Sequence, residues 1–228
     1  MPEFHAPLSS IDKAETRRYA GLRGDAAFSD DLLDKACSEA LILVKPKGCW
    51  ERYRYDASTG TIHSLPAICL KSHSILRHLA DTVEVAVLAV TIGPLLEEAV
   101  AEHFAAGDYT FGLLLDSAGS AAVEAVANAV NGLITDQASR SGLSSLFRFS
   151  PGYGDWEITD QPQILDLSGG RRLGIEVTAS CMLLPRKSVT AVVGLKTTKG
   201  ENTTTGCKPE GCQACLQRNC PARKENPQ

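Results

Sequence analysis

The sequence lacks the features that direct a chain to a membrane or out of the cell. Its first ten residues contain Pro2 and Pro7 and have neither the basic start nor the apolar run of a signal peptide. No window reaches about 18 unbroken apolar residues, the length that a membrane-spanning helix needs. We therefore expect a cytoplasmic protein with no membrane partner, in which thiols are kept reduced.

The sequence also lacks a large excess of either charge. Its 228 residues carry 23 Lys and Arg against 27 Asp and Glu, a formal net charge of −4. Nothing in this bulk charge suggests a nucleic-acid or acidic-lipid partner, so we expect no nucleic-acid partner; the balance fits an enzyme or a protein-binding module equally well. There is no internal repeat of solenoid length. A hydrophobic share of 43% predicts a globular body with a real core.

The eight cysteines are distributed unevenly. Cys37, Cys49, Cys69 and Cys181 are isolated, and we expect Cys37, Cys69 and Cys181 to be small buried hydrophobic residues. Four others crowd together near the C-terminus, beyond a linker at residues 196–206 that has no apolar side chain. The sequence thus predicts two parts: a body, residues 1–196, and a polar linker with a Cys-rich tail, residues 197–228.

The tail cysteines are spaced closely enough to share one metal centre. Their pattern is C-x4-C-x2-C-x4-C, formed by Cys207, Cys212, Cys215 and Cys220. Four thiolates at this range can hold one zinc ion or one iron–sulfur cluster, and the spacing does not select between them. The alternative is a thiol-rich tail that binds no metal.

Periodicity and turn residues predict the elements of the body. The order is helix, strands, helices, strands, which favours an α+β fold over a doubly wound α/β sheet. We expect residues 173–182 and 188–195 to form an antiparallel pair of strands joined by residues 183–187. The other expected strands are 49–55, 61–65 and 83–90, and the expected helices are 12–23, 31–44, 72–80, 94–106 and 111–134.

The segment with the most unusual composition is residues 148–156, RFSPGYGDW. Arg148 can hold a carboxylate with two parallel hydrogen bonds. Glycine lets a ligand approach the backbone closely. Tyr153 and Trp156 offer flat surfaces for a purine or a sulfonium cation. The alternative is a structural loop that carries a surface arginine.

This segment resembles the signature of a known family. Arg-x-x-Pro-Gly-Tyr, residues 148–153, is similar to the S-adenosylmethionine-binding loop of the activation domain of cobalamin-dependent methionine synthase. The helical residues 116–126 and the strand, Pro-turn and Ser-Val strand of residues 173–193 are also similar to that family. The resemblance covers about residues 80–196. It implies an α+β fold with a twisted antiparallel or mixed sheet and packed helices, to which this chain adds its Cys-rich tail.

The resemblance assigns roles to five residues. Arg148 would hold the carboxylate of S-adenosylmethionine, and Ser150 and Gly152 would contact the ligand mainly through their backbones. Tyr153 would pack on the ligand or hydrogen-bond to it. Glu124 would project from its helix toward the positive end of the ligand; the alternative is a solvated helix residue.

The chain departs from the full-length enzymes in several ways. Residues 140–147 contain no acid where the family carries one, and the polar linker stands where the family carries a Tyr. The zinc, folate and corrinoid-binding modules are absent from the sequence, as is the Asp-x-His-x-x-Gly pattern of a corrinoid ligand. This chain therefore needs a corrinoid-carrying partner for any methyl transfer to cobalamin.

Three functions remain open from the sequence. The first is a reactivation subunit of methionine synthase, which uses S-adenosylmethionine and an electron donor such as flavodoxin to reduce and methylate cob(II)alamin held by the partner. The second is a reactivator of another corrinoid methyltransferase, with the cysteine tail as an electron relay. The third is a non-catalytic module that binds a corrinoid protein and carries a structural zinc tail. The need for an electron at low potential favours iron–sulfur over zinc in the tail.

Overall fold

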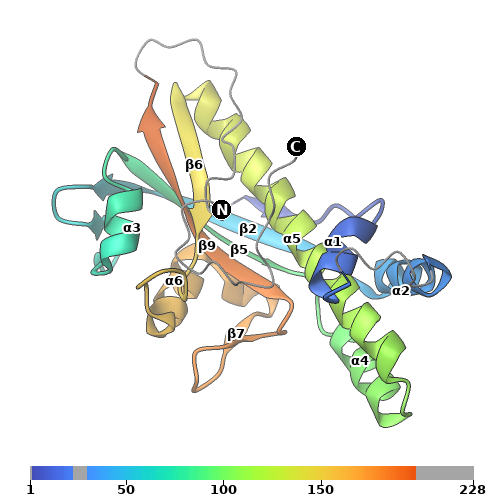
Figure 1. Ribbon diagram of the computed structural model, residues 1–228. Coiled ribbons are helices and arrows are strands. Elements are labelled where there is room, and N and C mark those ends of the chain that lie inside the picture. Colours follow the sequence, from blue (N-terminus) through green and yellow to red (C-terminus); the bar gives the residue numbers. More distant parts are fainter. Residues whose placement is uncertain (1, 23–29, 199–228) are drawn as a thin grey trace.

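The computed structural model describes residues 2–22 and 30–198. Their centre is an antiparallel sheet with the strand order β4-β3-β2-β5-β9-β6, and β1 pairs with β2 (Figure 1). A separate two-stranded sheet is formed by β7 (Glu176–Val177) and β8 (Leu183–Leu184). The main-sheet strands are β1 (Glu3–Phe4), β2 (Lys47–Asp56), β3 (Thr61–Ile62), β4 (Ile68–Cys69), β5 (Glu84–Thr91), β6 (Leu143–Phe149) and β9 (Ser188–Thr197).

Helices cover both faces of this sheet (Figure 1). The helices are α1 (Lys13–Tyr19), α2 (Asp30–Leu43), α3 (His73–His78), α4 (Leu95–Ala105), α5 (Tyr109–Arg140) and α6 (Gln161–Ser168), with short 3-10 turns at Ile158–Asp160 and Gly170–Leu173. The long helix α5 packs on one face, with α1, α2 and α4 against it. Helices α3 and α6 contribute to the hydrophobic core of the other face. We call these the α5 face and the α3/α6 face.

Strand β5 lies at the centre of both cores. Its residues 85–91 are all buried, as the near-absence of charge in this segment predicts for a strand covered on both sides. Ala86, Leu88 and Val90 belong to the core of the α5 face. Val85 and Val87 point the other way, into the core of the α3/α6 face.

Helix α5 packs closely on its neighbours through a small residue. A Cβ atom placed on Gly119 would lie 2.6 Å from a methyl carbon of Leu96, so a larger residue would force the Leu96 side chain to move. Within the described part of the chain, α5 is the one helix long and apolar enough by length and composition to cross a bilayer, but 61% of its most apolar window is buried inside the fold. A core helix that is mostly buried passes the same test of length and composition.

The expected fold class is confirmed, and so are most of the elements. The helices expected at 31–44, 72–80, 94–106 and 111–134 and the strands expected at 49–55, 61–65 and 83–90 are present, with ends that shift by a few residues. The longest elements that were not predicted are strand β6 and helix α6; the two-residue strands β1, β4 and β8 were not predicted either. The strands expected at 49–55 and 61–65 pair with each other, as the antiparallel pair β2–β3.

The antiparallel pair expected from residues 173–182 and 188–195 is wrong. Residues 173–182 form the two-residue strand β7 and a turn, in which the Cys181 N–H donates to the Thr178 carbonyl over 2.9 Å. Gly174 and Cys181 have positive φ angles of 82° and 61°, which interrupt an extended strand. Strand β9 pairs instead with β5 on one side and β6 on the other.

The cysteine expectations have mixed outcomes. Cys37 is buried, Cys181 is half-buried, and Cys69 is exposed, so the expectation of burial is wrong for Cys69. Within residues 2–22 and 30–198, no group of three or more His, Cys, Asp and Glu side chains is placed to hold a metal ion. The predicted metal ligands Cys207, Cys212, Cys215 and Cys220 lie outside the described residues.

Candidate functional site

A line of polar side chains runs along α5 on the α5 face. Asp116, Ser120, Glu124 and Asn128 follow one another at intervals of four residues, which places them on one side of the helix. The first three are half-buried among buried neighbours, and Asn128 is exposed. Their spacing is visible in the sequence, but the sequence does not show their ion-pair partners, so the pattern alone indicates a solvated side of the helix. The structure brings two basic side chains from distant segments, strand β6 and the residue before β9, against this line.

Arg148 is the first of these partners. Strand β6 places it opposite Val193 of β9, so both side chains point toward α5. The Arg148 guanidinium donates from Nη1 to the Asn128 amide oxygen over 2.6 Å and from Nη2 to the Glu124 carboxylate. The side chains of Arg148 and Glu124 are 21% and 29% exposed, so the ion pair is only partly screened by water.

Tyr19 of α1 lies near the same carboxylate. Burial raises the pKa of the Tyr19 phenol, and the negative charge of Glu124 raises it further. Tyr19 also lies beneath a cation, because the guanidinium of Arg18 stands 4.0 Å from the centre of its ring. Glu124 is therefore enclosed by groups from α1, α5 and β6, and is not the solvated residue of the alternative interpretation.

Lys187 is the second basic partner of the line. Its ammonium lies 2.9 Å from the Asp116 carboxylate and donates to the Ser120 hydroxyl over 2.9 Å. Its backbone N–H donates to the Glu97 carboxylate over 2.7 Å, which joins the start of β9 to α4. The Lys187 side chain is 11% exposed. Asp116 and Glu124 are eight residues apart, so the two ion pairs are separated by about 12 Å along the helix.

The loop that follows Arg148 is held by its own hydrogen bonds. The Ser150 hydroxyl donates to the Thr190 carbonyl of β9 over 2.7 Å. Gly152 has a φ angle of 91°, which favours glycine, and its N–H donates to the Trp156 carbonyl over 2.7 Å. The Tyr153 N–H donates to the Ser150 carbonyl over 3.1 Å. The backbone donors of Gly152 and Tyr153 are thus already used within the loop.

The two large aromatic residues of the loop have different environments. Tyr153 is 54% exposed and meets the ring of Phe149 edge to face, with 5.8 Å between ring centres. Trp156 is 1% exposed, stacks on Phe149, and donates from Nε1 to the Asp160 carboxylate over 2.7 Å. The expectation that Trp156 offers a surface to a purine is therefore wrong, because its ring belongs to the core of the α3/α6 face.

Asp155 ties the loop to α3. Its carboxylate accepts hydrogen bonds from the Ser72 hydroxyl and from the backbone N–H groups of His73 and Ser74, at 2.6, 3.0 and 2.8 Å. The Ser72 and Ser74 contacts hold the pKa of Asp155 well below its ordinary value. On the same face, burial lowers the pKa of His78, whose Nε2 lies 2.9 Å from the Phe147 carbonyl.

The predicted site residues therefore occupy two faces. The structure brings Glu124 and Arg148 into contact, and it fixes Ser150 and Gly152 in the loop next to them. Tyr153 packs on Phe149, a neighbour of the core of the α3/α6 face. Asn128 and Lys187 were missed by sequence reasoning, because their partners come from elements far apart in the chain.

Comparison with known proteins rests on structure alone. No family model and no curated protein matches this chain. One of the matching solved structures is the crystal structure of the MetH reactivation domain bound to AdoHcy. It covers 93% of this chain and 83% of that chain with a TM-score of 0.62 and 14% sequence identity. The chain shares that fold. At this identity the likeness confirms the expected α+β architecture and leaves ligand and partner to be argued from the residues.

Proposed function

We propose that this chain binds S-adenosylmethionine beside Arg148 and supports the reactivation of a corrinoid protein. The observation that carries the proposal is the position of Arg148, which the sequence resemblance assigns to the ligand carboxylate. Arg148 is the first residue of the Arg-x-x-Pro-Gly-Tyr segment, and its guanidinium is oriented against α5 by Glu124 and Asn128. The fold shared with the AdoHcy-bound MetH reactivation domain supports the same conclusion.

The arginine retains capacity for a ligand. A guanidinium has five N–H donors in a fixed plane, and Asn128 and Glu124 occupy one each in the contacts described above. The remaining donors suit a carboxylate, which accepts two hydrogen bonds from one arginine. In this arrangement Glu124 positions Arg148, and its carboxylate stands near the ammonium of an amino acid bound there. This extends the role that the resemblance gives to Glu124.

The partner of this module is proposed to be a corrinoid-binding methionine synthase. S-adenosylmethionine would supply the methyl group and a reductant such as flavodoxin the electron, converting the partner's cob(II)alamin to methylcobalamin. The chain's own part is to bind the methyl donor and to present it to the partner. Reactivation of a different corrinoid methyltransferase requires the same site, and the identity of the protein captured with the chain distinguishes the two.

A second candidate function follows from the same ion pair. Arg148 is already paired with Glu124. If Arg148 neither releases Glu124 nor binds a second anion, its role is structural. The chain would then be a non-catalytic module that binds a corrinoid protein. Ligand binding separates this function from the first.

Calorimetry with S-adenosylmethionine and AdoHcy tests the proposal. We expect both to bind the intact protein and Arg148→Ala to weaken binding by about ten- to hundredfold, because a charged hydrogen-bonded pair is lost. Glu124→Gln should weaken binding less, since it disorients the arginine without removing it. Arg140→Ala, at the exposed end of α5, is the matched control and should bind like wild type. If neither ligand binds the wild-type protein, the first function is contradicted and the non-catalytic module is the remaining function.

Anaerobic purification followed by metal analysis tests the tail. We propose one metal centre at Cys207, Cys212, Cys215 and Cys220, with iron–sulfur favoured because reactivation needs an electron. We expect iron and visible absorption that disappear when the four cysteines are replaced by serine. One zinc per chain without iron would support the structural alternative, and four freely titrating thiols without metal would remove the site.

A further inference from the structure

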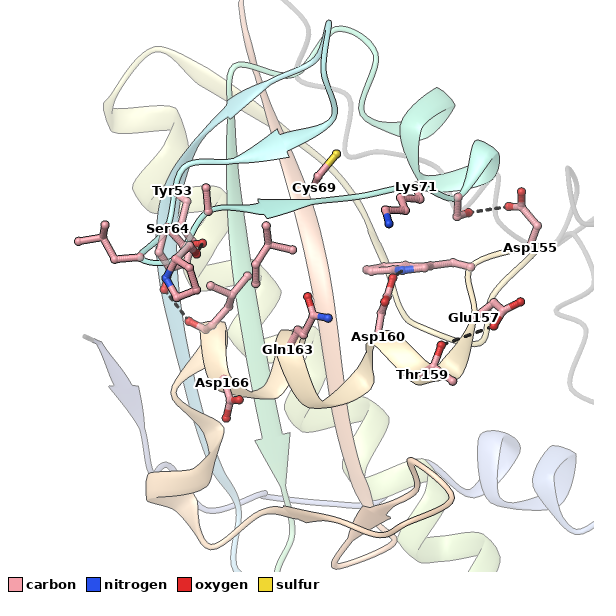
Figure 2. Close-up of a pocket in the computed structure, with 17 residues that line it drawn as sticks. Tyr53, Ser64, Cys69, Lys71, Asp155, Glu157, Thr159, Asp160, Gln163 and Asp166 are labelled. Carbon is pink, nitrogen blue, oxygen red and sulfur yellow. Dashed lines mark hydrogen bonds between the residues drawn. The ribbon is translucent and has the colours of Figure 1, made fainter.

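A cavity of about 920 Å³ lies on the α3/α6 face, away from the ion pairs along α5. Figure 2 shows it between the segment that leads into and out of β4 on one side and helix α6 with the preceding 3-10 turn on the other. Its volume is at the upper end of the range of about 300–1,000 Å³ that is typical of small-molecule sites. Nothing in the function proposed above uses this space.

The walls of the cavity are joined to each other by hydrogen bonds between distant segments. The Tyr53 hydroxyl of β2 donates to the Leu167 carbonyl of α6 over 2.8 Å. At the opposite end, Asp155 accepts its three hydrogen bonds from residues 72–74. The apolar part of the lining includes Ala67, Ile68 and Leu167, of which Ile68 and Leu167 adjoin the core of this face. The cavity is therefore formed before any ligand arrives.

Three polar side chains of different chemistry face this space (Figure 2). Lys71, just after β4, and Gln163, on α6, form no hydrogen bond or ion pair with any residue that the structure describes. Asp160 accepts the Trp156 Nε1–H on Oδ2, which fixes the carboxylate and leaves Oδ1 without a partner in the described ranges. One cation, one carboxylate oxygen and one amide are thus available to a ligand.

We propose that this cavity binds a small zwitterion with an apolar body, of about the size of a dipeptide. The ligand carboxylate would pair with Lys71, its ammonium with Asp160, and its amide with Gln163, while its apolar side chains cover Ile68 and Leu167. A simple anion fits poorly, because carboxylates outnumber Lys71 around the cavity. A simple cation leaves Lys71 unpaired beside it. This proposal does not depend on the proposed S-adenosylmethionine site, and it stands whether or not S-adenosylmethionine binds.

Binding of the dipeptide Leu-Leu, measured by calorimetry, tests this site. Two blocked forms of the same peptide separate charge from apolar contact: N-acetyl-Leu-Leu lacks the ammonium and Leu-Leu amide lacks the carboxylate. We expect saturable binding of Leu-Leu and a loss of about threefold to tenfold for each blocked form, as for a partly exposed charged contact. Equal binding of all three peptides would overturn the proposal in favour of an unspecific apolar hollow.

Matched variants locate the binding. Lys71→Gln should weaken Leu-Leu but leave Leu-Leu amide unchanged, and Asp160→Asn, which keeps an acceptor for Trp156, should weaken Leu-Leu but leave N-acetyl-Leu-Leu unchanged. Lys35→Gln on α2 and Asp136→Asn on α5 change the same charges on the other face and should bind like wild type. Arg148→Ala should not alter Leu-Leu binding, which separates this site from the proposed function. Undetectable Leu-Leu binding at millimolar concentration, or wild-type binding by both Lys71→Gln and Asp160→Asn, would refute the site.

Discussion

The two faces of the sheet differ in whether their polar side chains have partners within the protein. On the α5 face a single long helix carries the polar line, and its acids form ion pairs with Lys187 and Arg148 from distant segments of the chain. On the α3/α6 face short helices and turns surround a cavity, where Lys71 and Gln163 have no partner among the described residues. A ligand on the α5 face must therefore bind side chains that already have a partner in the protein. A ligand in the cavity of the α3/α6 face can pair with side chains that have no partner among the described residues.

The loop of residues 148–156 connects these two environments. Its first residue, Arg148, points toward α5, and its last, Trp156, is part of the opposite core. Asp155 ties it to α3, and Ser150 ties it to β9. The loop is thus held at both faces, so a change at one of its ends can be compared with a change at the other.

The largest effect is expected at the buried end of this loop. Trp156→Ala should lower the free energy of unfolding by about 3–5 kcal/mol, because it leaves a cavity in the core of the α3/α6 face. Tyr153→Ala, at an exposed position in the middle of the same loop, should cost less than about 1 kcal/mol. Urea denaturation of both variants measures the contrast. Equal losses would mean that the ring of Tyr153 is as deeply packed as that of Trp156.

An intermediate effect is expected at the buried ion pair of the α5 face. Lys187→Met should lower the free energy of unfolding by about 1–2 kcal/mol, less than for a fully buried pair, because Asp116 keeps some contact with water. Adding Asp116→Asn should recover part of this loss, since the uncompensated carboxylate is removed. A double-mutant cycle by denaturation measures the coupling. Strictly additive losses would show that the pair contributes nothing.

The smallest effect is expected at Asp155 and depends on pH. Hydrogen bonds lower its pKa in the folded state, so its contribution to stability is present above the unfolded value of about 3.9 and is lost as the pH falls through the folded value. Asp155→Asn should flatten the fall in urea midpoint between pH 5 and pH 2. Asp136→Asn, on the exposed side of α5, should keep the wild-type profile. If both variants follow wild type, the contacts of Asp155 with residues 72–74 do not stabilise the folded protein.

The sequence by itself determined what periodicity and local turn chemistry encode. The β-branched, nearly uncharged run of residues 83–90 predicted strand β5, and the helical periodicity of residues 31–44 predicted α2. The Arg-x-x-Pro-Gly-Tyr segment pointed to the loop, and the resemblance to the methionine synthase activation domain pointed to Glu124 and Arg148. These signals are carried by residues close together in the chain.

Only the tertiary structure decided which distant segments meet. Residues 188–195 were recognised as a strand, but its neighbours β5 and β6 lie about 40 or more residues away, and a strand's pattern specifies its faces, not its partners. The pairing of Arg148 with Glu124 and Asn128 depends in the same way on the packing of β6 against α5. The cavity beside Lys71 depends on the packing of α6 against the segment around β4. A local sequence pattern shows which side of a helix or strand is apolar. Which residues that side contacts depends on the packing of the whole core.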